Sequence, residues 1–223
     1  MGLGTLKRYV QIAFNGTAQQ VRRILPQIPY DSRIIIEAGT PYIKRTGMNG
    51  VHLIRRMWRG IVVADIKVTD GAGQEVMFSA GAGANAATVM GSAPVETLDF
   101  FVKFCKNHNI FSMIDMLGVE NPLRKMLPMK TRPDVVVIHK GRDEESNKKR
   151  MIRYKDITKI RSKYDSLISV AGGLDHNSVR KAYFNGADIA ILNVIAPNDP
   201  NQGLPDSANF RTLIPRILSE VGQ

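Results

Sequence analysis

The chain has 223 residues, of which 43% are hydrophobic and 23% charged, a composition ordinary for a globular protein. No apolar stretch reaches the roughly 20 residues that a membrane-spanning helix requires, and a single cysteine, Cys105, excludes a disulfide framework and a zinc site built on paired cysteines. The first nine residues lack the basic-then-apolar order of a secretory signal, so we expect a cytoplasmic protein with no membrane contact.

The net charge of +11 is concentrated in two segments. Residues 140–163 contain ten basic and four acidic side chains, and residues 44–59 contain five basic and no acidic ones. Such runs attract polyanions, whether nucleic acids or phosphorylated metabolites. Aromatic residues do not alternate with these cations as they do on surfaces that stack nucleic-acid bases. We interpret the runs as solvated helix surface and keep nucleic-acid binding only as an alternative.

Short, mostly β-branched apolar runs alternate with longer amphipathic stretches along the chain. The runs predict strands buried on both faces, and the stretches predict helices. In chain order the predicted elements are a strand at 9–14, a helix at 17–25, a strand at 33–36, a helix at 47–58, a strand at 61–66, a helix at 73–80, a strand at 86–90, a helix at 95–107, a strand at 110–114, a helix at 120–126, a strand at 134–138, a helix at 145–162, a strand at 167–170, a helix at 177–184, a strand at 188–192 and a helix at 207–220. We expect N-caps at Thr17, Asp175 and Asp206, and helix ends at Gly81 and Gly186.

Eight strand–helix units without an intervening linker predict one α/β domain over residues 1–223, a single (β/α)₈ TIM barrel. An open, doubly wound sheet of eight strands is the alternative. In a barrel, the active site forms where the strands end at their C-termini. Charged residues at those positions are therefore candidates for function.

The densest group of such residues follows the predicted strand at 61–66. Alternation along a strand places Asp65 and Lys67 on the same side, and Asp70 can return toward that side through the next turn. An acid–lysine–acid cluster keeps the lysine protonated and places a cation where negative charge develops. A salt-bridge network at the barrel rim is the structural alternative.

Further candidates end other strands. Glu37 follows the strand at 33–36 and could join Asp65 as a ligand of Mg²⁺, which takes one or two carboxylates together with water and substrate. Gly172 and Gly173, placed before a predicted helix, could seat a phosphate on their backbone N–H groups, or could simply form a tight turn. His139 ends an apolar strand and could exchange protons near neutral pH.

The remaining residues of these types have structural interpretations. His52, His108 and His176 fall on helix surfaces or ends, where solvation accounts for them. Cys105 lies in an apolar helical stretch and is assigned to the core.

Five segments together resemble a known family. They are Ile36-Glu-Ala-Gly-Thr-Pro-Tyr-Ile-Lys, Val62-Val-Ala-Asp-Ile-Lys-Val-Thr-Asp, Gly83-Ala-Asn-Ala-Ala-Thr-Val-Met-Gly-Ser-Ala, Ile138-His-Lys-Gly-Arg-Asp-Glu-Glu and Val170-Ala-Gly-Gly-Leu-Asp. In this order they resemble the orotidine 5′-monophosphate decarboxylase superfamily, and within it the 3-hexulose-6-phosphate synthases and 3-keto-L-gulonate-6-phosphate decarboxylases. The resemblance implies a Mg²⁺-dependent lyase that passes through a 1,2-enediolate of a ketose phosphate.

By this resemblance, several residues acquire roles. Glu37 and Asp65 would hold the metal, and Lys67 would stabilise or protonate the enediolate. Asp70 would reach into the neighbouring subunit's site in a homodimer.

On the opposite side of the substrate, His139 and Arg142 would handle proton transfer. Gly172 and Gly173 would seat the phosphate.

The chain departs from the family pattern at two places. Asn15 stands where the family usually has Asp, and Asn193, in Ile191-Leu-Asn-Val-Ile, lies where a glycine pair or Gly-Arg usually holds phosphate. We expect both asparagines to contact the substrate. Hexulose-6-phosphate synthase activity, which joins formaldehyde to ribulose 5-phosphate, is the first choice, and the decarboxylase, which Arg142 resembles equally, is the alternative enzyme. A barrel that binds a phosphorylated ligand or nucleic acid without turnover is the alternative of another class.

Overall fold

The computed structural model describes residues 3–4, 7–147 and 151–221. Most of its strands begin and end within two residues of the predicted positions. They are β1 (Tyr9–Phe14), β2 (Ile34–Ala38), β3 (Ile61–Val68), β4 (Ala86–Met90), β5 (Phe111–Asp115), β6 (Val135–His139), β7 (Leu167–Ala171), β8 (Ile189–Ile195) and a short β9 (Leu204–Pro205).

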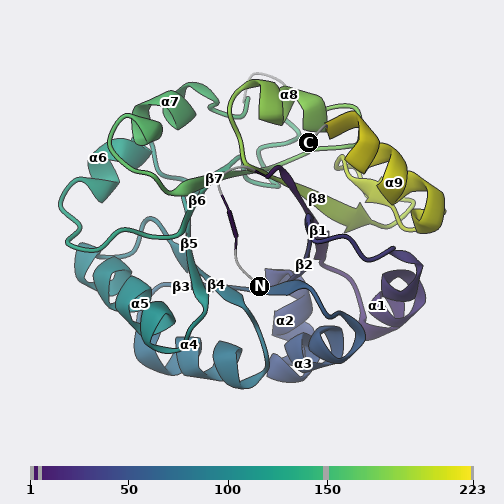
Figure 1. Cartoon of the computed structure of the whole chain (residues 1–223), viewed down its shortest axis with the longest axis horizontal. Coiled ribbons are helices and arrows are strands. Elements are labelled where there is room, and N and C mark those ends of the chain that lie inside the picture. Colours follow the sequence, from purple (N-terminus) through teal and green to yellow (C-terminus); the bar gives the residue numbers. More distant parts are fainter. Residues whose placement is uncertain (1–2, 5–6, 148–150, 222–223) are drawn as a thin grey trace.

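The eight long strands close into a barrel (Figure 1). Each pairs in parallel with its neighbours in chain order, and β1 also pairs with β8, with Tyr9 opposite Ile189 and Phe14 opposite Val194. The β1–β8 pairing confirms the (β/α)₈ barrel and excludes an open sheet. The small β9 extends the sheet beside the C-terminal end of β8.

The helices form a ring outside the barrel (Figure 1). They are α1 (Ala18–Ile24), the 3₁₀ helix η1 (Leu25–Gln27), α2 (Thr40–Thr46), α3 (Met48–Met57), α4 (Ala72–Gly81), α5 (Val95–Asn107), α6 (Pro122–Met126), α7 (Lys155–Arg161), α8 (Val179–Phe184) and α9 (Phe210–Val221). No helix of the described chain is both long enough and apolar enough to cross a bilayer.

The helix predictions were wrong at two places. The helix predicted at 145–162 is helical only over α7, since residues 142–146 form turns in which Ser146 Oγ donates to the Asp143 carbonyl at 3.0 Å, a local bond that competes with a helix. Part of the predicted span, 148–150, lies outside the described residues. The pattern also missed α2, whose seven residues between Gly39 and Gly47 are too few to show a helical period.

The predicted caps had mixed outcomes. Thr17 is the N-cap of α1 and accepts from the backbone N–H of Gln20 at 3.2 Å, and α4 ends at Gly81 as expected. Asp175 and Asp206 do not cap helices, because α8 and α9 begin several residues later. Asp175 accepts from the backbone of the turn before α8 instead, and Asp206 pairs with a side chain of α1.

Strand alternation divides the apolar residues into two layers. One set points outward and packs under the helices, as Ile12, Ile36 and Val62 do, and Cys105 of α5 belongs to this same core. The other set fills the barrel, as Ile35 and Val63 do. The residue two positions beyond an inward-pointing apolar side chain also points inward, but nearer the C-terminal mouth. The two-residue alternation along each strand therefore determines which side chains meet at the C-terminal mouth of the barrel.

Candidate active site

The inward-pointing residues nearest the C-terminal mouth are polar on most strands. They line a cavity of about 210 Å³ together with residues of the loops above it. The strand residues concerned are Gln11, Glu37, Asp65, Thr88, His139 and Asn193, to which Asp115 adds a carboxylate just below the cavity surface. Such a concentration of polar side chains in an otherwise apolar barrel marks this end as the candidate active site.

Asp65 and Lys67 contact each other as predicted. Lys67 Nζ lies 3.1 Å from Asp65 Oδ1, and Asp65 also accepts from Thr88 Oγ1 at 2.8 Å and from Thr40 Oγ1 at 2.7 Å. Lys67 has a left-handed backbone with φ of 50°, and β3 shifts register against β4 between Ala64 and Val68. This irregularity at the strand end lets the lysine turn over the mouth.

Asp115 completes the acid–lysine–acid cluster, rather than Asp70. Its carboxylate pairs with Lys67 Nζ and, at 2.9 Å, with Nδ1 of His139. Burial would lower the pKa of Lys67, but Asp65 and Asp115 outweigh it and raise that pKa, so the ammonium stays charged. Burial likewise opposes the charge of His139, and Asp115 overcomes it and raises the pKa of the imidazole.

Asp70 lies exposed on the turn after β3 and does not line the cavity of its own chain. The expectation that it returns to the side of Asp65 and Lys67 was therefore wrong within one chain. The reason is geometric, because Val68 still belongs to β3 and the turn then runs directly into α4 with Gly71 in the left-handed region (φ 64°). An exposed Asp70 is free to contact a second subunit.

Glu37 stands beside this cluster and behaves differently. It is buried, it accepts from Gln11 Nε2, and burial together with the nearby Asp65 raises its pKa to about 8. A carboxyl whose charge is disfavoured by a neighbouring carboxylate is stabilised by a cation between the two.

The donor set fits Mg²⁺. Glu37 and Asp65 offer carboxylate oxygens, and Gln11 Oε1 is buried with no hydrogen-bond partner among the described residues. Hard oxygen donors of this kind, with space left for water and substrate, are what Mg²⁺ takes. No group of three or more His, Cys, Asp or Glu side chains is arranged to hold a metal within the described chain.

The predicted substrate contacts also line the cavity, apart from Gly173. Asn15 Nδ2 donates to Asn193 Oδ1 at 3.0 Å, so the two residues that depart from the family pattern form one amide pair at the mouth. Gly172 and Gly173 both have positive φ, 112° and 62°, and a Cβ on Gly172 would lie 2.3 Å from the Lys140 carbonyl oxygen. Only glycine fits this turn.

Arg142 also lines the cavity, and its guanidinium pairs with Asp199 from the loop after β8. The loop after β6 and the loop after β8 are thus joined above the mouth. This contact was not predicted, because no local pattern links residues 57 positions apart.

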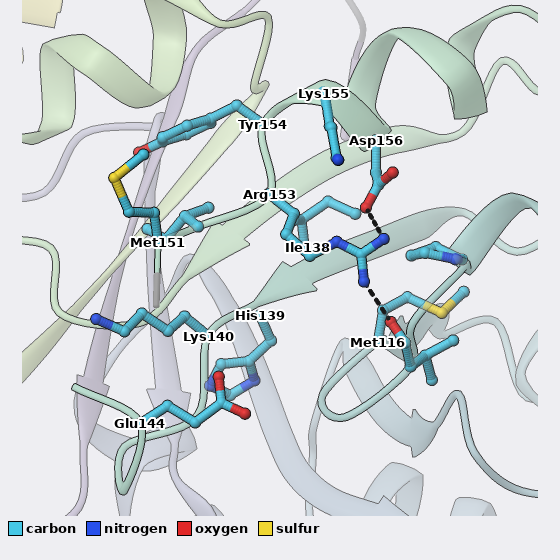
Figure 2. Close-up of a pocket in the computed structure, with 13 residues that line it drawn as sticks. Met116, Ile138, His139, Lys140, Glu144, Met151, Arg153, Tyr154, Lys155 and Asp156 are labelled. Carbon is cyan, nitrogen blue, oxygen red and sulfur yellow. Dashed lines mark hydrogen bonds and ion pairs between the residues drawn. The ribbon is translucent and has the colours of Figure 1, made fainter. Parts of the chain in front are cut away.

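A second cavity, of about 560 Å³, shares the lining residue His139 with the first (Figure 2); we call the cavity of about 210 Å³ the inner cavity and this one the outer cavity. His139 lines both, while Lys140, Glu144, Met151 and Tyr154 line only the outer one. Part of the basic segment at 140–163 therefore lines this cavity or forms ion pairs, as Arg153 does with the buried Asp156 at 2.9 Å. His52 lies on α3 and His108 at the end of α5, as expected, whereas His176 lies on the turn before α8.

Some functional residues were missed although a signal existed. Gln11 and Thr88 are polar residues inside strands that are otherwise apolar. Asp115 was recognisable as a charged residue at a strand end, like Asp65, but its sequence position gave it no role. Polar residues at inward positions near strand ends would have identified Gln11 and Thr88.

Comparison with known proteins agrees with this geometry. The model of the Orotidine 5'-phosphate decarboxylase / HUMPS family matches residues 8–193. The chain is similar to the "Bifunctional enzyme Fae/Hps" of Methanothrix thermoacetophila, at 36% identity over 96% of the chain and 52% of the relative, and to that of Methanocella arvoryzae, at 35% identity over 82% and 48%. It spans about half the length of these curated relatives.

Solved structures give the same barrel. The chain is similar to 3-hexulose-6-phosphate synthase from Salmonella typhimurium, with a TM-score of 0.80, 25% identity and coverage of 96% of this chain and 99% of that one. It also resembles KGPDC from Streptococcus mutans, with a TM-score of 0.71 over 97% and 100% of the two chains; at 18% identity this likeness shows the fold alone.

Proposed function

Since this chain belongs to the Orotidine 5'-phosphate decarboxylase / HUMPS family, we propose that it is a Mg²⁺-dependent carbon–carbon lyase that acts on a phosphorylated ketose. The reaction we propose first is that of 3-hexulose-6-phosphate synthase, which joins formaldehyde to ribulose 5-phosphate or reverses that step. The observation that supports it most is the cluster of Asp65, Lys67, Asp115 and His139 beside Glu37. The relatives named Hps, similar over most of this chain, favour the same reaction.

In this proposal Lys67 is the electrostatic catalyst. Its ammonium is kept charged by Asp65 and Asp115, so it cannot accept a proton from the ketose. It can instead hold the oxygen on which negative charge develops as the enediolate forms, and a preorganised cation in a closed site lowers the energy of such a charge.

His139 is the proposed proton-transfer group. In its neutral form His139 would take the C1 proton of the ketose as the enediolate forms, and Asp115, which raises the pKa of the imidazole, favours this uptake. The protonated ring would then give that proton to the alkoxide left when the new carbon–carbon bond forms. In the cleavage direction the neutral imidazole would accept the hydroxyl proton. Arg142, which lines the same cavity, would assist on this side.

Glu37 and Asp65 would hold the metal in this proposal. A bound Mg²⁺ would neutralise charge on the ketose oxygens. Gly172 and Gly173 would seat the phosphate on backbone N–H groups, and Asn15 with Asn193 would contact the sugar. The protein would act as a homodimer in which Asp70 serves the partner's site, consistent with its exposure on its own chain.

Removal of the metal tests the proposed cofactor. Excess EDTA should abolish turnover, and added Mg²⁺ should restore it, because without the cation nothing neutralises the charge that develops on the ketose oxygens beside Asp65, and the buried Glu37, with its pKa raised to about 8, takes up a proton. EDTA already saturated with Mg²⁺ is the control and should not inhibit. Full activity in excess free chelator would remove the metal from the mechanism.

Product analysis separates the proposed reactions. We expect formaldehyde release from hexulose 6-phosphate among a panel of ketose 6-phosphates with Mg²⁺, with CO₂ measured in parallel on 3-keto-gulonate 6-phosphate. CO₂ alone would select the decarboxylase. Neither product from any sugar would favour the barrel that binds its ligand without turnover.

A further inference from the structure

Glu145 is a cavity residue to which neither the sequence nor the proposed mechanism gives a task. It lies in the loop after β6, three residues beyond Arg142, and lines the inner cavity together with Gly172. A Cβ added to Gly173 would lie 3.0 Å from Glu145 Oε2 and 3.1 Å from its Cδ. The carboxylate is thus packed directly onto the glycine turn that follows β7.

The surroundings of the Glu145 carboxylate are those of an anion-binding site. Burial raises the pKa of Glu145, while the backbone of Gln202 and of Gly173 and the nearby Lys140 and Arg142 favour its charged form. Oε2 itself is buried without a hydrogen-bond partner within the described part of the chain. The Glu145 carboxylate thus lies near backbone groups and two cations, yet one of its two oxygens has no partner among the described residues.

The same turn is the seat that the proposed function assigns to the substrate phosphate. A carboxylate and a phosphate cannot share one set of backbone donors, since like charges at contact distance repel strongly. We propose that the Glu145 carboxylate occupies the phosphate seat in the ligand-free chain and leaves it when a phosphorylated ligand binds, so that Glu145 determines the affinity of this site for phosphate. The inference rests on the proposed function for the identity of the seat.

The contacts of the same loop show what the phosphate would exchange. Arg142 pairs with Asp199, which joins the loop after β6 to the loop after β8, and the backbone of Gln202 in that second loop favours the charged form of Glu145. An arriving phosphate offers Arg142 an anionic partner and takes the Gly173 backbone from Glu145. Arg142 and the Gly173 backbone would thus exchange a protein carboxylate for the ligand, and the contact between Glu145 and Gln202 would be released.

Anion binding tests the inference directly. Calorimetric titration with inorganic phosphate should show about tenfold tighter binding to Glu145→Gln than to the wild type, because the isosteric amide removes the competing charge. The matched control is Glu144→Gln, which removes the same charge from the adjacent residue, whose side chain lines the outer cavity instead (Figure 2). Its phosphate affinity should stay near that of the wild type.

Equal affinities for phosphate in Glu145→Gln and Glu144→Gln would overturn the inference. Glu145→Ala provides a second variant that opens the seat without an amide, and it should bind phosphate at least as tightly as Glu145→Gln. Thermal unfolding of each variant identifies any that does not fold.

Kinetics distinguish this inference from the function on which it rests. Glu145→Gln should lower KM for the phosphorylated ketose and leave kcat within about threefold, a split that a purely structural role would not produce. Turnover with unchanged phosphate affinity and KM would refute the role of Glu145 while the lyase stands. Tighter phosphate binding to Glu145→Gln without release of formaldehyde or CO₂ would refute the lyase activity, while the proposal that Glu145 occupies the phosphate site would remain supported.

Discussion

Lys67→Ala and Asp70→Ala homodimers are each expected to be nearly inactive, and a mixture of the two is expected to regain about a quarter of the wild-type activity. Either loss removes a charge that the proposed mechanism directs at the enediolate, and removing one such group commonly costs roughly 10²–10³ in rate. Lys67 lies in the cavity of its own chain, paired with Asp65 and Asp115. Asp70 does not line that cavity, so its effect depends on the proposed dimer.

The recovery follows from how the two residues would be shared. If each site combines its own Lys67 with the partner's Asp70, a mixed dimer contains one site with both defects and one with neither. Random exchange makes about half of the dimers mixed, and about one site in four is then intact. Mass spectrometry confirms that the subunits have exchanged. Absence of recovery after confirmed exchange would mean that Asp70 acts in its own chain or not at all.

Asp115→Asn is expected to have the second largest effect. Asp115 is buried and is the shared partner of Lys67 and His139, so the amide leaves two partly buried cations with less compensation. Removing one partner of such a buried charge cluster costs about 3 kcal/mol or more in the free energy of unfolding. We also expect turnover to fall about 10²-fold, since His139 loses the group that favours its uptake of the proton.

The titration of His139 provides the specific measurement. In the wild type Asp115 raises the pKa of the imidazole above its ordinary value, and in Asp115→Asn burial should instead lower it. A raised folded-state pKa stabilises the fold below the unfolded histidine value of about 6.5, and that contribution is lost as the pH rises through the folded-state pKa. NMR titration of the His139 ring and unfolding between pH 5 and pH 9 should therefore both change in the variant.

Asp156→Asn is the matched control for this experiment. Asp156 is equally buried and paired with Arg153 and Lys159, but it has no contact with the His139 ring among the described interactions. It should lower the stability and leave the His139 titration as in the wild type. The same His139 titration in Asp115→Asn as in the wild type would contradict the assigned role of Asp115.

The sequence by itself determined the barrel and about half of the candidate site. Buried strands have a period of two and alternate with helices, and both signals are local enough to read without coordinates. Because the C-terminal strand ends meet at one mouth, Glu37, Asp65, Lys67 and His139 could be placed together from their positions alone.

Only the tertiary structure decided which carboxylate completes the cluster. Asp70 is three residues from Lys67, whereas Asp115 is 48 residues away, yet the closed sheet brings Asp115 to the lysine. The direction of the turn after β3 depends on a left-handed Lys67 and on Gly71, which sequence periodicity does not encode.

The conformation of the loops above the mouth could likewise not be predicted from the sequence. The segment at 145–162 has the composition of an amphipathic helix, but its first residues lie in turns. There Glu145 packs against Gly173, and the preceding Arg142 pairs with Asp199 of the loop after β8. Contacts between loops of different strand–helix units are set by how far each loop reaches over the barrel. That reach is a property of the assembled fold, whereas the strands that carry the loops follow from a local pattern of apolar residues.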